Sequence, residues 1–147
     1  MEIRFDDLTH PAVVALIRYH RQSAASLTPS PDSVHALDVE GLRRPEITVW
    51  TAWDGDDLLG CAALNEIDTT HGEVKSMRTA PSHLRRGVAA ALLRRLLDEA
   101  EDRGYARVSL ETGAGDGFVA ARALYRRFGF VPCGPFAEYP DDRNSVW

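Results

Sequence analysis

The residues best suited to chemistry lie where a predicted strand meets a long predicted helix. In the run RTAPSHLRRGVAAALLRRLLDEA, which starts at Arg78, Arg85 and Arg86 precede Gly87, and apolar residues then recur at helical spacing. The first turn of a helix has free backbone N–H groups and the positive end of the helix dipole, so it binds phosphate. Gly87 would let an anion approach closely, and the arginines suit a pyrophosphate. A tight turn with solvated arginines explains the same spacing, so both interpretations stay open.

Length, composition and charge narrow the kind of protein. The 147 residues, 44% of them hydrophobic, suit one domain over 1–147. A formal net charge of −5 gives no general reason to expect nucleic acid or an anionic membrane as partner. No apolar run could span a membrane and the start of the chain lacks a signal-peptide core, so we expect a cytoplasmic protein. Cys61 and Cys133 lack metal-ligand spacing, and we expect two buried thiols and no metal site.

The hydrophobic periodicity predicts alternating strands and helices. Strands are expected at 2–6, 46–53, 58–67, 73–79, 106–112, 131–136 and 144–147. Helices are expected at 11–24, from 30 to about 42, at 87–103 and at 118–128. The order βααβββαβαββ predicts an α+β fold with a mixed, mostly antiparallel sheet and one right-handed crossover through the helix at 87–103.

Two sequence stretches resemble the signatures of the GNAT superfamily of N-acetyltransferases. PSHLRRGVAAALL is similar to their acetyl-CoA pyrophosphate loop, in which Arg or Gln is followed by two residues, Gly, one residue, and Gly or Ala. Gly87 and Ala89 fit this pattern, whereas Leu84 stands where the family has Arg or Gln. The later stretch ARALYRRFGFVPCGPF resembles the family's tyrosine-bearing helix and Gly-Phe turn. The resemblance covers the whole chain and implies the GNAT fold.

A closer resemblance is to a bacterial subgroup often labelled indole-3-acetic acid acetyltransferase. The stretches GEVKSMRT, SLETG and FGFVPCGPFAEYPDDRNSVW carry it. Indoleacetate has no free amine, so the label does not define an acceptor.

The resemblance implies that acetyl-CoA is the co-substrate, held by the strand before the loop, by the loop, by the first helical turn and by the start of the tyrosine helix. These residues are Met77, Arg78, Thr79, Leu84, Arg85, Arg86, Gly87, Val88, Ala89, Ala90 and Phe118. Phe118 stands where many members carry Asn.

Amide formation by direct attack on a thioester needs a neutral amine, donors to the thioester carbonyl and a proton for the leaving thiolate. By resemblance, Glu73 is the candidate general base, with Glu111 and Glu66 as rivals, and Tyr125 is the candidate acid that protonates the sulfur. An exposed glutamate at the start of a strand and a buried aromatic residue on an amphipathic helix are the alternatives without chemistry.

The acceptor is expected to contact His35, Lys75, Arg78 and Glu111. Plain strand alternation would place Lys75 and Arg78 on different faces, so only one of them needs to point at the acceptor. A carboxylate on the acceptor would explain such a cation. The function that we predict is acetyl transfer to the amine of a small, amino acid-like metabolite. A protein or peptide acceptor and a non-catalytic acyl-CoA-binding module are the alternatives. Exposed sheet edges are compatible with a homodimer.

Overall fold

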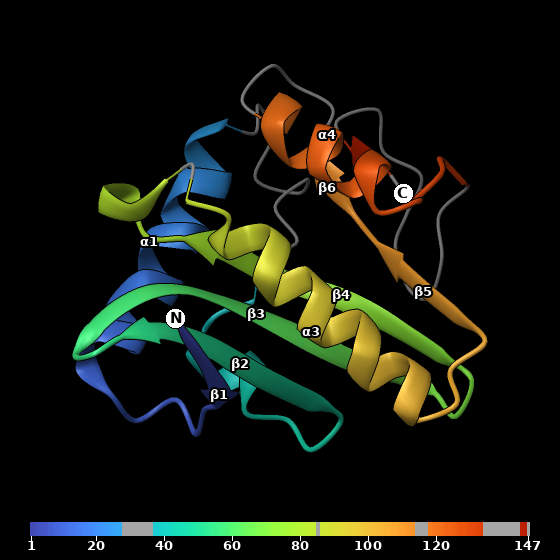
Figure 1. Ribbon diagram of the computed structural model, residues 1–147, viewed down its shortest axis with the longest axis horizontal. Helices are drawn as coiled ribbons and strands as arrows, with labels where there is room; N and C mark the ends of the chain where they lie inside the picture. The colour runs from blue at the N-terminus through green and yellow to red at the C-terminus, as the bar shows by residue number, and fades with distance from the viewer. Residues whose placement is uncertain (28–36, 85, 114–117, 134–144, 147) are drawn as a thin grey trace.

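The computed structural model describes residues 1–27, 37–84, 86–113, 118–133 and 145–146 (Figure 1). Two residues of the predicted site, His35 and Arg85, lie outside these ranges.

The centre of the fold is a five-stranded sheet with the order β1-β2-β3-β4-β5. Its strands are β1 (Glu2–Phe5), β2 (Ile47–Asp54), β3 (Asp57–Asp68), β4 (His71–Thr79) and β5 (Arg107–Leu110). The first four strands pair antiparallel, while β4 and β5 pair in parallel. Parallel neighbours need a long crossover connection, and here a helix provides it. The mixed sheet agrees with the predicted α+β class.

Helices cover both faces of this sheet (Figure 1). The crossover helix α3 (Val88–Asp102) lies on one face and buries Leu92, Leu93 and Leu96 against the sheet. Helix α1 (Pro11–Leu27) lies on the other face, where Val13 and Ile17 enter a second apolar cluster together with side chains of β2 and β3. The short helix α2 (Val39–Leu42) extends this second layer, and the Asp38 side chain caps it. The sheet is therefore the middle of three layers.

The C-terminal part differs from the predicted strands. Instead of one strand over 106–112, β5 ends at Leu110 and a short strand β6 (Thr112–Gly113) follows, paired with β7 (Ser145–Val146). Helix α4 (Val119–Arg127) agrees with the predicted tyrosine helix. Residues 131–133, predicted as the start of a strand, are not in one. Pro132 has no N–H for a ladder, and Val131 is 76% exposed, so it lacks the packing that would hold a strand.

Within the described residues, no helix is both long enough and apolar enough to cross a membrane.

Candidate active site

The sheet opens between β4 and β5. The two strands pair from His71↔Arg107 to Val74↔Leu110, and no β4–β5 pair follows in the described residues. They lie side by side at one end and diverge toward the end where α4 is found (Figure 1). From residue 75 onward, the β4 edge on this side therefore has no β5 backbone as partner. A chain of amide groups could add to this edge as a further strand would.

A bulge in β4 shapes the edge of this opening. Residues 75–78 of β4 oppose 61–63 of β3, so β4 carries one extra residue here. Ser76 takes up this residue with a φ of 51°, a conformation uncommon outside glycine. The thiol of Cys61 donates a hydrogen bond to the Ser76 carbonyl oxygen at 3.3 Å. The bulge thus re-aims the side chains that follow it.

Because of the bulge, Lys75 and Arg78 lie on the same face of the sheet. Lys75 pairs with Ala63 and Arg78 with Cys61, and both partners belong to the apolar cluster under α1. Met77, between them, packs into the α3 core instead. The expectation from plain alternation, that Lys75 and Arg78 reach different faces, was wrong because it did not include the extra residue.

The N-terminus of α3 lies beside the same opening. A 3₁₀ turn, Pro81–His83, connects β4 to it, and Gly87 caps α3 in the left-handed conformation with a φ of 77°. No side chain caps the helix in the part of the chain that the structure describes, so the N–H groups of the first turn, Val88 to Ala90, are open to a ligand. Leu84 is 61% exposed, and a nitrogen of the Arg86 guanidinium lies 3.1 Å from His83 Nδ1.

Gly60 of β3 holds this helix close to the sheet. A Cβ atom at Gly60 would lie 2.8 Å from the Arg78 carbonyl oxygen and 2.9 Å from Cγ1 of Val88. Only glycine permits this three-way approach of β3, β4 and α3. The free N–H groups of α3 and the unpaired edge of β4 are therefore held next to each other.

Glu73 is buried under the α1 face of the sheet, with 2% exposure. Its carboxylate accepts a hydrogen bond from Asn65 Nδ2 at 3.0 Å and pairs with Lys75 Nζ at 3.3 Å. The Lys75 side chain is itself only 11% exposed. An ammonium and an amide donor thus hold the Glu73 carboxylate in place on this face of the sheet.

Tyr125 projects from α4, its ring edge-to-face with Phe130 at 5.9 Å between centroids. Burial raises the pKa of Tyr125 to about 12; the charge of Glu111 acts in the same direction, and that of Arg78 opposes it. The hydroxyl is therefore protonated at neutral pH. Arg78 and Glu111, charges of opposite sign, both act on the hydroxyl.

Tyr125 also lines a cavity of about 400 Å³ between β5 and α4. The residues lining it come from α3, β5, β6, α4 and the segment after α4, and within the described chain none comes from β4. Because β4 contributes no described residue, we do not assign the co-substrate to this cavity.

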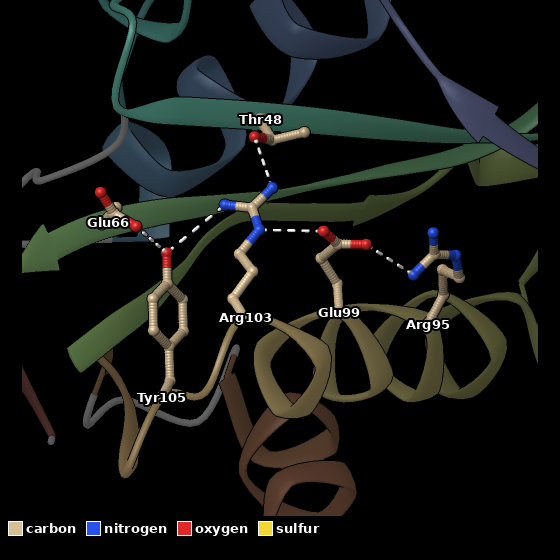
Figure 2. Close-up of polar contacts among 6 residues, drawn as sticks. All are labelled: Thr48, Glu66, Arg95, Glu99, Arg103 and Tyr105. Atoms are coloured by element: carbon tan, nitrogen blue, oxygen red, sulfur yellow. Dashed lines mark hydrogen bonds and ion pairs between the residues drawn. The ribbon is translucent and has the colours of Figure 1, made fainter. Parts of the chain in front are cut away.

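Glu66, the second rival base, belongs to a different part of the molecule. It accepts a hydrogen bond from the Tyr105 hydroxyl at 2.6 Å, and Arg103 at the C-terminal end of α3 contacts that hydroxyl at 3.4 Å (Figure 2). Arg103 also bonds Thr48 of β2 and Glu99 of α3. This network fastens the far end of α3 to the sheet, so Glu66 lies at the opposite end of α3 from the open N–H groups.

The two cysteines differ from each other. Cys61 is buried, which raises the pKa of its thiol to about 12, as expected for an inert core residue. Cys133 is exposed, so the expectation of a buried thiol was wrong there. It follows Val131 and Pro132, which form no strand that could carry it into the core.

Two α1 residues at the site were missed from the sequence. Arg78 Nε donates a hydrogen bond to His20 Nδ1 at 2.9 Å, and the guanidinium carbon lies 5.5 Å from the centre of the Tyr19 ring. Burial, together with the Arg78 charge, lowers the pKa of His20 to about 4. No motif announces this contact, because 58 residues separate His20 from Arg78.

Within the described residues, the end of β4 without a β5 partner lies beside the uncapped N–H groups of α3, which can bind phosphate, and α4 carries a protonated tyrosine. Comparison with known proteins agrees. Residues 14–130 match the Acetyltransferase (GNAT) family, and the chain belongs to that family. It is accordingly an acyltransferase of the N-acetyltransferase class, EC 2.3.1.-.

Several of the similar proteins come from bacteria. The chain is 56% identical over 147 residues to the uncharacterized N-acetyltransferase YsnE of Bacillus subtilis (strain 168), covering 100% of this chain and 97% of that protein. It is 37% identical over 139 residues to the IAA acetyltransferase of Azospirillum brasilense, covering 92% and 88%. The crystal structure of a putative acyl-CoA N-acyltransferase from Klebsiella pneumoniae superimposes with a TM-score of 0.78 at 26% identity, covering 99% and 92%.

Proposed function

We propose that this enzyme transfers the acetyl group of acetyl-CoA to the amine of a small metabolite by direct attack. The observation that carries the proposal is the opening between β4 and β5 beside the uncapped N-terminus of α3. Membership of the GNAT family supports acetyl-CoA as the donor.

The residues around the opening fit a pyrophosphate and its pantetheine arm. The N–H groups of Val88, Ala89 and Ala90 would bind the pyrophosphate, with Gly87 leaving room for close approach and Arg86 adding charge at the rim. Leu84 would take part through its backbone, because its side chain offers no donor. Arg85 joins this proposal from the sequence alone.

The unpaired β4 edge would bind the pantetheine. Its backbone at Met77, Arg78 and Thr79 provides the donors and acceptors that an amide-containing arm needs. Phe118, half-buried where α4 begins, would contact the arm only by packing.

In the reaction that we propose, Glu73 accepts one proton from the acceptor ammonium, through a water molecule, so that a neutral amine attacks the thioester carbon. The carbon–nitrogen bond forms while Met77 N–H donates to the carbonyl oxygen, which gathers negative charge. The carbon–sulfur bond then breaks and the Tyr125 hydroxyl gives its proton to the sulfur. One of the two protons left on the attacking nitrogen replaces it on Tyr125, and the other stays as the amide hydrogen. The balance is one amide, one free thiol and one released proton.

The test is the release of free thiol from acetyl-CoA by the purified protein with amino acids, polyamines, aminoglycosides and short peptides, with acetyl-CoA binding measured by calorimetry. Thiol release that requires a small amine is the expected result. Release only with peptides would replace the small acceptor by a polypeptide one. Acetyl-CoA binding without release from any amine would leave a binding module, and no binding at all would refute the loop assignment.

A further inference from the structure

We infer that the acceptor carries a free carboxylate next to its amine, as an amino acid does, and that Arg78, held by His20 and Tyr19, binds this carboxylate. The inference rests on the proposed function, because it names the substrate class for the same site.

The first step is the direction in which Arg78 points. Its β4 position pairs with Cys61, which lies in the apolar cluster under α1, so the side chain starts on the α1 face. From there it reaches α1, where Nε donates to His20 Nδ1 at 2.9 Å and the guanidinium lies over the Tyr19 ring at 5.5 Å. With Nε used by His20, the two terminal nitrogens bond no acidic side chain of the described residues and form a fork that matches a carboxylate.

The second step is charge. His20 can accept the Arg78 hydrogen bond only as a neutral imidazole, so it fixes the guanidinium without neutralising it. Among the described residues, no acidic side chain forms an ion pair with Arg78. Arg78 is also half-buried, where an uncompensated charge is unfavourable. A bound anion would compensate it.

The third step is position relative to the reaction. Arg78 directly follows Met77, whose N–H is the proposed donor to the thioester oxygen, and its charge acts on the Tyr125 hydroxyl. An anion at the guanidinium would therefore lie beside the reacting thioester. The charge of Glu111 acts on the same hydroxyl with the opposite sign. A zwitterion with adjacent amine and carboxylate fits this separation of charges.

Neither the amine of a lysine side chain within a protein nor a peptide N-terminus has a free carboxylate on the carbon next to its amine. The free carboxylate beside the amine therefore distinguishes free amino acids from protein and peptide acceptors. We expect free amino acids to be acetylated with kcat/KM values at least about 100-fold above those of their carboxamides, because the carboxamide leaves Arg78 unpaired.

Two sets of variants test the residues. Arg78→Gln should lower kcat/KM for the amino acid much more than for its carboxamide, so that the preference of about 100-fold collapses. Arg44→Gln, at an exposed arginine remote from the site, is the matched control and should keep the preference. As a test of positioning, His20→Leu should raise the KM for the amino acid with little change in kcat, and His20→Asn, which keeps an acceptor near the Nδ1 position, should restore it.

Equal rates with amino acids and carboxamides would overturn the inference, and so would a preference that survives Arg78→Gln. The wild-type comparison of acid and amide does not depend on whether a variant folds. If no amino acid is acetylated but another amine is, this inference fails and the proposed function stands. If no amine of any class supports thiol release, the proposed function itself fails.

Discussion

If the N-terminus of α3 binds an anion, a negative charge placed there should stabilise the folded protein but weaken the binding of acetyl-CoA. Ala89→Asp places a carboxylate in the first turn of α3, whose N–H groups have no side-chain cap in the described chain. A negative charge there interacts favourably with the helix dipole, and we expect the free energy of unfolding to rise by about 0.3–1 kcal/mol. The same charge would repel a bound pyrophosphate.

The size of this repulsion follows from Coulomb's law. Two unit charges about 5 Å apart interact by about 3 kcal/mol at an effective dielectric constant of about 20, and by about 1 kcal/mol in bulk water. The first turn of α3 is partly exposed, so the true value falls between these limits. We expect acetyl-CoA affinity to fall by about 10- to 100-fold, since every 1.4 kcal/mol is a factor of ten.

Calorimetric titration with acetyl-CoA measures the affinity, and urea unfolding measures the stability. Ala12→Asp is the matched control, because it makes the same change in the first turn of α1 and should leave acetyl-CoA affinity unaltered. Added salt should narrow the gap between Ala89→Asp and wild type. Unchanged affinity in a stably folded Ala89→Asp protein would refute an anion site at this helix end.

The remaining predictions concern the residues behind the loop. Tyr125→Phe keeps the ring packing and should lower kcat about 100-fold with little change in acetyl-CoA binding; an unchanged kcat in steady-state assays removes Tyr125 from the mechanism. Glu73→Gln should lower kcat and, by breaking the buried ion pair with Lys75, destabilise the protein by about 3 kcal/mol in urea, whereas normal turnover excludes Glu73 as base. Gly60→Ala should cost about 1–3 kcal/mol through overpacking, and a urea midpoint equal to wild type would contradict the close approach. His20, with its pKa lowered to about 4, binds a proton in the unfolded chain at a higher pH than in the folded one. The contribution of His20 to stability should therefore fall by about 2.6 kcal/mol between pH 6.5 and pH 4, and the slope should be smaller by this amount in His20→Asn; equal slopes would refute a neutral His20.

The parts of the fold that could be predicted are those whose signal is local. The amphipathic period of α3 and the Asp-Gly turn between β2 and β3 each lie within a short window, and both were predicted within a few residues. The glycine that begins α3 was likewise visible as the site of a helix start. For the candidate site, this local signal indicated the loop and the strand before it.

The parts that could not be predicted depend on contacts distant in sequence. No glycine marks the bulge at Ser76 in the sequence. Unless the bulge is known, the faces on which Lys75 and Arg78 lie cannot be assigned. His20 acquires its role only when α1 packs under β4. The predicted strand at 131–133 shows the converse error, since Val131 favours a strand but has no neighbour that would bury it.

The bulge links the two halves of the proposed site. The extra residue, Ser76, comes two residues after the last β4–β5 pair, where β4 has lost its β5 partner and would bind the pantetheine. The same residue turns Arg78 under α1, toward His20. A left-handed serine costs roughly 1 kcal/mol or more, and the hydrogen bond from the Cys61 thiol to the Ser76 carbonyl is weak, so local energetics alone would not maintain the bulge. The packing of Met77 into the α3 core and the contact of Arg78 with α1 fix the backbone from both faces. One backbone irregularity thus positions both the edge that would hold the donor and the cation that would select the acceptor. A substitution that removes the bulge would disturb both together.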